Sequence, residues 1–143
     1  YRKQVIIEDQ PAILDILDTL DQDYSSKIGN LWMQETDGFV IVYSITDAET
    51  FAQCQVFRDK IMREINPNGN KMIPFVLVGN KCDLTDKRQV TTNEGETLAK
   101  DWKCPFVETS VKDKIKNGIC FIECAKQIRY AKKVNYTHDD TKT

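Results

Sequence analysis

One stretch of this chain, residues 74–83, changes from an apolar run to a polar one within a few positions. Residues 75–78 are continuously apolar and include two β-branched valines, which is typical of a strand buried on both faces of a parallel sheet. From Gly79 onward the residues are polar, and we expect them to form the loop at the carboxyl end of that strand. Because ligands of open α/β sheets bind outside the carboxyl ends of the strands, this loop is a candidate binding site.

The loop carries an amide, an ammonium and a carboxylate, at Asn80, Lys81 and Asp83. A carboxylate accepts two hydrogen bonds at once and therefore suits a partner with two adjacent N–H donors. Guanine presents such an edge, with its ring N–H and its exocyclic amine, and adenine does not. The alkyl stem of Lys81 can cover a base while its ammonium stays solvated, and Asn80 can tie the loop to its neighbours. The same residues also fit an ordinary polar turn after a strand.

A second stretch, residues 105–112, repeats this design of an apolar strand followed by a polar exit. Asn80-Lys-Cys-Asp83 and Glu108-Thr-Ser-Val-Lys112 closely resemble, in this order, the two guanine-binding signatures of the Ras branch of the small GTPases. The family's second signature has alanine at Val111, where the backbone N–H binds the guanine oxygen, so valine keeps this donor. The resemblance implies that six residues bind the guanine nucleotide, GTP or GDP: Asn80, Lys81, Asp83, Ser110, Val111 and Lys112.

The resemblance extends over nearly the whole chain and implies an α/β fold, a P-loop GTPase-like open sheet with helices on both faces. Tyr1 and Arg2 match the start of a strand that forms a sheet edge, to which effector domains add a strand of their own. The implied protein partners are effectors, exchange factors and GTPase-activating proteins. The implied cofactors are GTP or GDP and Mg²⁺.

Residues 18–23 depart from the family pattern, which reads Asp-Thr-Ala-Gly-Gln-Glu. Asp18 and Thr19 match its first two residues, and Asp18 corresponds to the carboxylate that reaches Mg²⁺ through water. Gln22 matches the catalytic residue that orients the attacking water. Asp21, however, replaces the glycine whose N–H meets the γ-phosphate, and like charges about 4 Å apart repel by about 4 kcal/mol at an effective dielectric of about 20. The alternative interpretation of this segment is an acidic surface loop.

The sequence contains no Gly-x-x-x-x-Gly-Lys-Ser/Thr motif, whose backbone would cradle the phosphates. Relative to the family fold, the first strand, the P-loop and the first helix are missing, a unit on the order of thirty residues. We therefore expect this chain on its own not to hydrolyse GTP, although the complete form of such a protein would. The chain is interpreted either as a fragment of a fuller GTPase or as a degenerate relative.

Two functional hypotheses follow from these observations. The first is a guanine-nucleotide-binding switch in signal transduction, which binds GTP and GDP and hydrolyses GTP in its complete form. The second is a catalytically inactive pseudo-GTPase that serves as an interaction module, or a non-functional fragment. The presence of a Gly-rich loop upstream of Tyr1 would favour the first hypothesis.

Composition excludes several other classes of protein. The 143 residues correspond to one domain, which we place at residues 1–134 with a short polar tail at 135–143. A net charge of −2 provides no basic surface for nucleic acid. The five cysteines have no disulfide or zinc spacing, which indicates reduced thiols in the cytoplasm. The last cysteine is Cys124, far from the end, so no prenylation box, polybasic cluster or apolar span predicts membrane attachment.

The remaining segments predict alternating strands and helices. Residues 2–8 and 12–17 are expected to form a β-hairpin with Pro11 in its turn. Residues 39–45 predict a buried strand, and Thr46 or Asp47 is expected to cap the helix that follows. The basic residues of the last helix are interpreted as a solvated face: Lys126, Arg129, Lys132 and Lys133. The predicted helices span residues 24–35, 48–65, 92–102 and 119–133.

Overall fold

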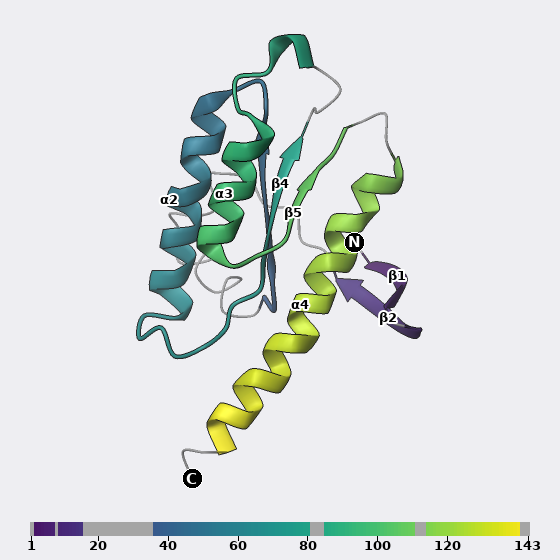
Figure 1. Cartoon of the computed structure of the whole chain (residues 1–143). Coiled ribbons are helices and arrows are strands. Elements are labelled where there is room, and N and C mark those ends of the chain that lie inside the picture. The colour runs from purple at the N-terminus through teal and green to yellow at the C-terminus, as the bar shows by residue number, and fades with distance from the viewer. Residues whose placement is uncertain (1, 8, 16–35, 81–84, 111–113, 141–143) are drawn as a thin grey trace.

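The computed structural model describes residues 2–7, 9–15, 36–80, 85–110 and 114–140. Its centre is a parallel sheet with strand order β3-β4-β5, covered by α2 and α3 on one face and by α4 on the other (Figure 1). The predicted α/β class with helices on both faces is confirmed. The elements of this unit are β3 (Phe39–Ser44), α2 (Ala48–Ile65), β4 (Phe75–Asn80), η2 (Thr85–Lys87), α3 (Thr92–Trp102), β5 (Phe106–Glu108) and α4 (Lys114–Asp140).

Strand β4 is the most deeply buried element of the sheet, as its apolar run predicts. Because successive side chains of a strand point to opposite faces, its residues divide between two cores. Phe75 and Leu77 belong to the core beneath α2 and α3, whereas Val76 and Val78 pack against α4. All four side chains are almost completely inaccessible to solvent. The strand therefore has to be apolar at every position, which explains the lack of alternation in its sequence.

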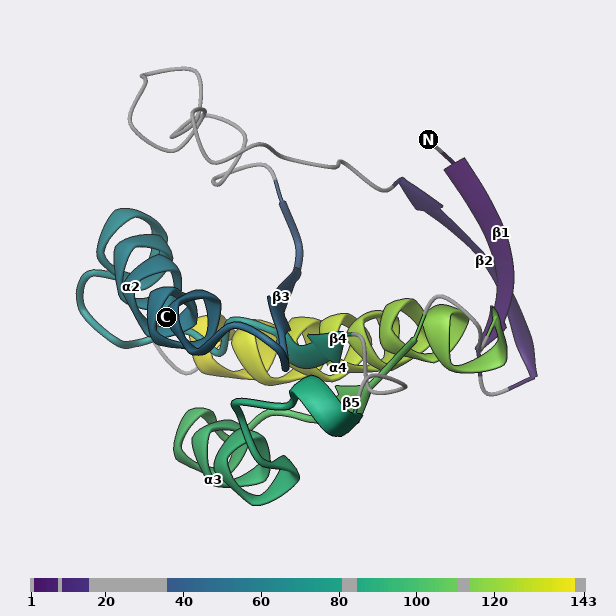
Figure 2. The same cartoon turned by 90° about the horizontal axis from the view of Figure 1, so that it is seen from above.

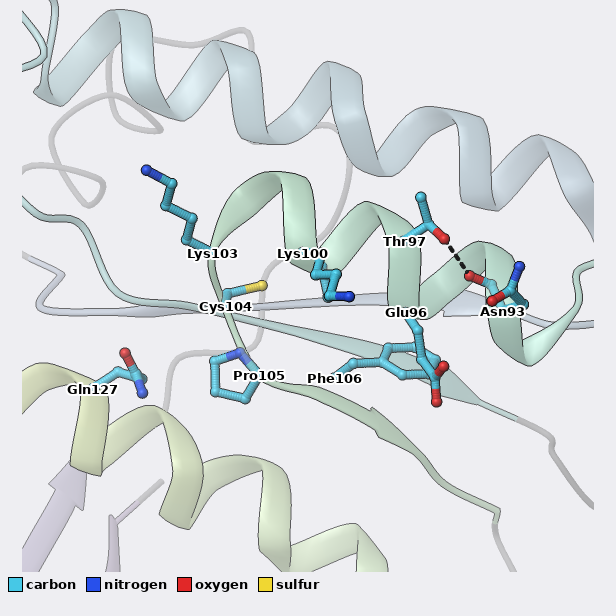
Figure 3. Close-up of a pocket in the computed structure, with 10 residues that line it drawn as sticks. Asn93, Glu96, Thr97, Lys100, Lys103, Cys104, Pro105, Phe106 and Gln127 are labelled. Carbon is cyan, nitrogen blue, oxygen red and sulfur yellow. Dashed lines mark hydrogen bonds between the residues drawn. The ribbon is translucent and has the colours of Figure 1, made fainter.

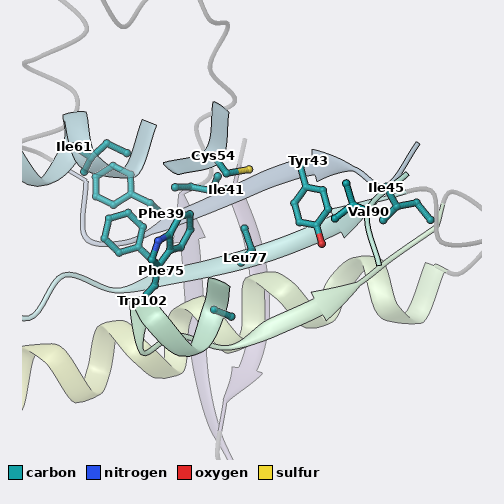
Figure 4. Packing of buried hydrophobic residues seen from close by; sticks show 11 residues of the cluster. Phe39, Ile41, Tyr43, Ile45, Cys54, Ile61, Phe75, Leu77, Val90 and Trp102 are labelled. Atoms are coloured by element: carbon teal, nitrogen blue, oxygen red, sulfur yellow. The ribbon is translucent and has the colours of Figure 1, made fainter. Parts of the chain in front are cut away.

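The larger core lies between the sheet and the helices α2 and α3 (Figure 4). Tyr43 from β3 packs edge-on against Phe51 from α2, with 4.8 Å between the ring centroids. Cys54 and Ile61 continue the same face of α2 at helical spacing, and both are buried. The apolar face of this helix is thus core packing.

The helix ends follow from local sequence signals in two of the three long helices. Asp47, one of the two predicted caps, accepts a hydrogen bond from the N–H of Glu49 at 3.0 Å and begins α2. Thr91 and Glu94 form a reciprocal capping box at the start of α3. The predicted bounds of both helices are confirmed. The last helix was predicted too short at both ends, and at its start the helix continues through Asn117-Gly118, a dipeptide that usually marks a turn.

The predicted hairpin is confirmed, but the position of Pro11 is wrong. Strands β1 (Arg2–Ile7) and β2 (Gln10–Asp15) pair with Ile7 opposite Gln10 and with Ile6 opposite Pro11. The turn therefore falls at residues 8–9, and Asp9 adopts a φ of 65°. In an antiparallel ladder, pairs that exchange hydrogen bonds alternate with pairs that do not. Ile7 and Gln10 form the pair that closes the turn, so the next pair, Ile6 and Pro11, exchanges no hydrogen bonds. Proline, which has no N–H, therefore fits at this position.

The hairpin forms a sheet of its own and packs against α4 (Figure 2). Ile7 is buried there, and its carbonyl accepts a hydrogen bond from Nη1 of Arg129 at 3.0 Å. Arg129 is therefore an exception to the predicted solvated face of this helix. Among the described residues, β3 pairs only with β4, and Val42 in the middle of β3 is 54% exposed. One long edge of the parallel sheet is thus open.

Candidate functional site

The carboxyl ends of β4 and β5 lie side by side at one edge of the sheet, near η2 (Figure 1). The N–H of Thr109 donates to the carbonyl of Gly79 at 2.8 Å, which extends the ladder beyond β5. The hydroxyl of Thr109 also donates to Oδ1 of Asn80, at 3.3 Å. The beginnings of the two predicted guanine loops are therefore joined by a backbone bond and a side-chain bond.

Asn80 is more firmly placed than the sequence indicated. Gly79 and Asn80 were predicted to open the loop, but both belong to β4, because the ladder with β3 continues through Ser44. The carbonyl of Asn80 accepts a hydrogen bond from the N–H of Ile45 at 3.1 Å. Its backbone is thus bonded to the β3 side, and its side chain is bonded to Thr109, directly beyond β5.

Of the predicted site residues, the structure describes Asn80, Ser110 and, for its backbone only, Arg2. Ser110 follows Thr109 at the same edge of the sheet, and both are buried polar residues. Arg2 opens β1, far along the chain from this edge. The predicted helix at residues 24–35 also lies outside the described residues, as do the following site residues: Tyr1, Asp18, Thr19, Asp21, Gln22, Lys81, Asp83, Val111 and Lys112.

Sequence reasoning missed three residues that organise this edge: Thr109, Arg88 and Thr92. Arg88 and Thr92 both bond to the carboxylate of Glu108, the first residue of the second signature. Thr109 lies within that signature. Its position directly after a strand was the sequence signal that could have identified it. The partnership of Arg88 with a carboxylate twenty residues away has no comparable local signal.

Tyr43 lies beneath the edge, with its hydroxyl close to Gly79 and Gly95. The hydroxyl is buried and has no hydrogen-bond partner among the described residues. Burial, with a smaller contribution from the nearby charge of Glu108, raises the pKa of Tyr43 well above its usual range. Tyr43 therefore stays neutral and acts as packing beneath the site.

An open groove runs along the outer edge of β5, between α3 and α4 (Figure 3). Its lining combines Glu96, Lys100 and Lys103 from the α3 region with Cys104 and Phe106 beside the strand. Neither Asn80 nor Ser110 lines it. The groove is thus separate from the edge that carries the predicted guanine signatures.

The described cysteines do not form a reactive or metal-binding centre. Burial raises the pKa of the Cys54 and Cys124 thiols to about 12 and that of Cys104 to about 11, so all three are protonated at neutral pH. Within the described ranges, no three side chains from His, Cys, Asp and Glu come together as metal ligands. In the same part of the chain, no helix has the length and apolar character needed to cross a bilayer.

The geometry thus provides two strand exits, joined side by side, each leading into one of the two guanine signatures. A comparison with protein-family models gives a match to the Ras family over residues 1–130. Proteins of this family are small GTPases, nucleotide-binding switches that bind guanine nucleotide and Mg²⁺ and interact with regulatory or effector proteins. The match covers most of the sequence and includes both signatures, and the chain therefore belongs to the Ras family.

Proposed function

We propose that this chain recognises the base of GTP and GDP at the carboxyl ends of β4 and β5, as part of a switch in signal transduction. The observation that carries this proposal is the hydrogen bond from the hydroxyl of Thr109 to Oδ1 of Asn80, at 3.3 Å. It brings together the starts of two signatures that are almost thirty residues apart in the sequence. Two loops that begin from one anchored point are suited to enclosing a planar base.

Within these loops the side chains have distinct roles. The carboxylate of Asp83 accepts from the ring N–H and the amine of guanine, and adenine lacks this pair of donors. Lys81 and Lys112 flank the base, while the N–H of Val111 donates to its oxygen. Ser110, buried beside Thr109, supports the second loop. Recognition of guanine therefore depends on hydrogen-bonding groups that an adenine nucleotide would leave unpaired, which weakens its binding.

Calorimetric titration of the purified chain with GDP and with ADP tests the proposal. We expect GDP to bind in preference to ADP, and equal affinities would refute the proposal. Replacement of Asp83 by Asn should weaken GDP and favour xanthosine diphosphate, because the amide can donate where the carboxylate could only accept. Asp86→Asn, in the neighbouring η2, removes the same charge from an exposed residue and should leave the preference for GDP unchanged.

On the phosphate side, Asp18 would hold Mg²⁺ through water, and Gln22 would orient the attacking water, with Thr19 between them in the chain. A carboxylate oxygen is a suitable outer ligand for this hard cation. Mg²⁺ neutralises charge on the phosphates when it is bound. Asp21 opposes the same phosphates by repulsion, so we propose that, in a protein supplied with an upstream Gly-rich segment, GTP hydrolysis stays slow and Asp21→Gly accelerates it. A single-turnover phosphate-release assay measures this, and hydrolysis at undiminished speed with Asp21 present would contradict it.

The alternative is a pseudo-GTPase that acts as an interaction module without catalysis. Its support is Asp21, which stands where the family has the glycine whose N–H meets the γ-phosphate. The interaction surface would be the outer edge of β1, which begins at Arg2, the residue after Tyr1, and for which the described residues provide no strand partner other than β2. Effector, exchange-factor or GTPase-activating domains that bind equally well with and without GDP or GTP would favour this alternative over the switch.

A further inference from the structure

Arg88 and Glu108 form the shortest and least exposed ion pair among the described residues. Nη1 of Arg88 lies 2.8 Å from Oε2 of Glu108, and Nη2 lies 3.3 Å from Oε1. The two side chains are only 20% and 18% exposed. A two-pronged contact between a guanidinium and a carboxylate fixes both direction and distance, which a single contact through a lysine does not. The pair therefore holds two backbone segments at a defined spacing.

Both partners are themselves anchored. Oε1 of Glu108 also accepts a hydrogen bond from the hydroxyl of Thr92, the first residue of α3, at 2.9 Å. Nη1 of Arg88 also donates to the carbonyl of Val90 at 2.9 Å. The N–H groups of Gln89 and Val90 donate to the carbonyl of Ile45, at 2.7 and 3.0 Å. The ion pair thus connects the end of β3, the start of α3 and the end of β5.

The position of this pair along the chain relates it to both guanine signatures. Residues 81–84 connect Asn80, which bonds to Thr109, with η2 and then Arg88. Residues 111–113 follow directly after the segment that contains Glu108 and Thr109. Each loop therefore leaves from, or returns to, a residue that belongs to the same hydrogen-bonded group. The carboxylate of Glu108 is occupied by Arg88 and Thr92, which leaves it no role in contacting a base.

We propose that Arg88 and Glu108 are positioning residues for guanine recognition, and that their ion pair sets the distance between the loop of Lys81 and Asp83 and the loop of Val111 and Lys112. This proposal rests on the proposed function for its effect on nucleotide binding. The ordering of the backbone around the ion pair does not depend on the proposed function, and it can be measured without nucleotide. Glu108, the first residue of the second signature, thereby affects recognition of the base only by positioning the backbone.

Amide hydrogen exchange of the nucleotide-free chain is the first measurement. In Arg88→Ala, the amides of Gln89, Val90 and Thr109, whose hydrogen bonds surround the ion pair, should exchange about tenfold faster, because a hydrogen-bonded charge pair is lost. The amide of Leu77, which bonds to the carbonyl of Pro105 at the opposite end of the β4–β5 ladder, serves as the internal control. Equal acceleration at Leu77 would mean general destabilisation and would overturn the proposal, as would unchanged exchange at all four amides.

Titration with GDP and with ADP is the second measurement. We expect Arg88→Ala and Glu108→Gln to weaken GDP about tenfold and to leave any weak ADP binding unchanged, because the loops lose their spacing and not their functional groups. Arg88→Lys keeps the charge without the two-pronged contact and should behave like Arg88→Ala; it also replaces that variant if alanine prevents folding. The control is Lys132→Ala, which removes an exposed ion pair with Asp37 and should change neither measurement.

The two measurements separate the proposals from each other. If the unaltered chain shows no preference for GDP, the proposed function fails, and hydrogen exchange alone decides whether Arg88 orders this edge of the sheet. If the unaltered chain prefers GDP and the Arg88 variants bind it as tightly, Arg88 and Glu108 are not positioning residues.

Discussion

Replacing Gly95 by alanine should destabilise the protein, although alanine is the better helix former. Gly95 is buried in the first half of α3 and faces two strands. A methyl group there would lie 2.5 and 2.6 Å from Cζ and Cε1 of Phe106, and it would overlap the hydroxyl of Tyr43. Carbon atoms in contact prefer about 3.5–4.0 Å. The helix and both rings would therefore have to separate by about 1 Å, at the place where α3 packs against side chains of β3 and β5.

The size of the effect follows from two opposed contributions. Alanine gains about 0.8–1.0 kcal/mol of helix propensity over glycine, whereas overpacking a core costs about 1–3 kcal/mol. Because two rings from two strands must move, we take the upper part of that range and expect a net loss of about 1–2 kcal/mol. Urea unfolding followed by circular dichroism should show a midpoint lower by about 0.5–1 M.

Two further variants make this prediction specific. Glu96→Ala changes the next residue of the same helix, which is exposed, and should shift the midpoint little. Tyr43→Phe in the Gly95→Ala background removes one of the two overlaps and should recover part of the lost stability. A Gly95→Ala protein that is as stable as the parent, or more stable, would show that propensity outweighs packing here and would refute the reasoning.

Three further predictions concern single side chains. Tyr43→Phe alone should raise the free energy of unfolding by up to about 1 kcal/mol, since it removes a buried hydroxyl without a partner among the described residues; Tyr130→Phe, at a residue that is 58% exposed, should have no measurable effect in the same urea titration. Above pH 9 the Cys54 thiol, whose pKa burial raises to about 12, stays protonated in the folded chain and ionises in the unfolded chain, so this thiol alone should lower the free energy of unfolding by about 1.4 kcal/mol per pH unit. Cys104 and Cys124 add similar contributions, and Cys54→Ala should remove only the share of Cys54 from the measured slope. Val42→Lys should decrease self-association in sedimentation experiments, because Val42 lies on the open edge of β3, whereas Val56→Lys on the exposed face of α2 should not.

The parts of the fold that the sequence predicts are those with strong local patterns. The four-residue apolar run of β4 requires burial on both faces, and such burial needs helices on both sides of the sheet. The helices α2 and α3 combine apolar spacing with side-chain caps at Asp47 and Thr91, so both their type and their ends could be read directly. In these segments local preference and tertiary packing agree.

The parts that could not be predicted depend on partners elsewhere in the chain. Pro11 is placed by the register of the hairpin, which puts the turn at residues 8–9 regardless of the usual preference of proline for turns. The extension of α4 back to Lys114 runs through Asn117-Gly118, a local turn signal that the rest of the helix overrides. Arg88 and Glu108 meet across twenty residues because a helix and a strand intervene, and no periodic pattern encodes such a contact.

The described structure indicates why recognition of the base can be separated from binding of the phosphates. The bonds that hold the edge near Asn80 and Glu108 arise from β3, β4, β5 and the start of α3, whereas the hairpin β1–β2 packs against α4. The base-binding edge therefore does not rely on the hairpin for its order. In the proposed function, phosphate contacts and Mg²⁺ contribute affinity for any nucleotide, while the carboxylate of Asp83 contributes the choice of base. With base contacts alone, binding near 1 mM corresponds to about 4 kcal/mol, which is enough to measure a preference for guanine and too little to stabilise a transition state for hydrolysis.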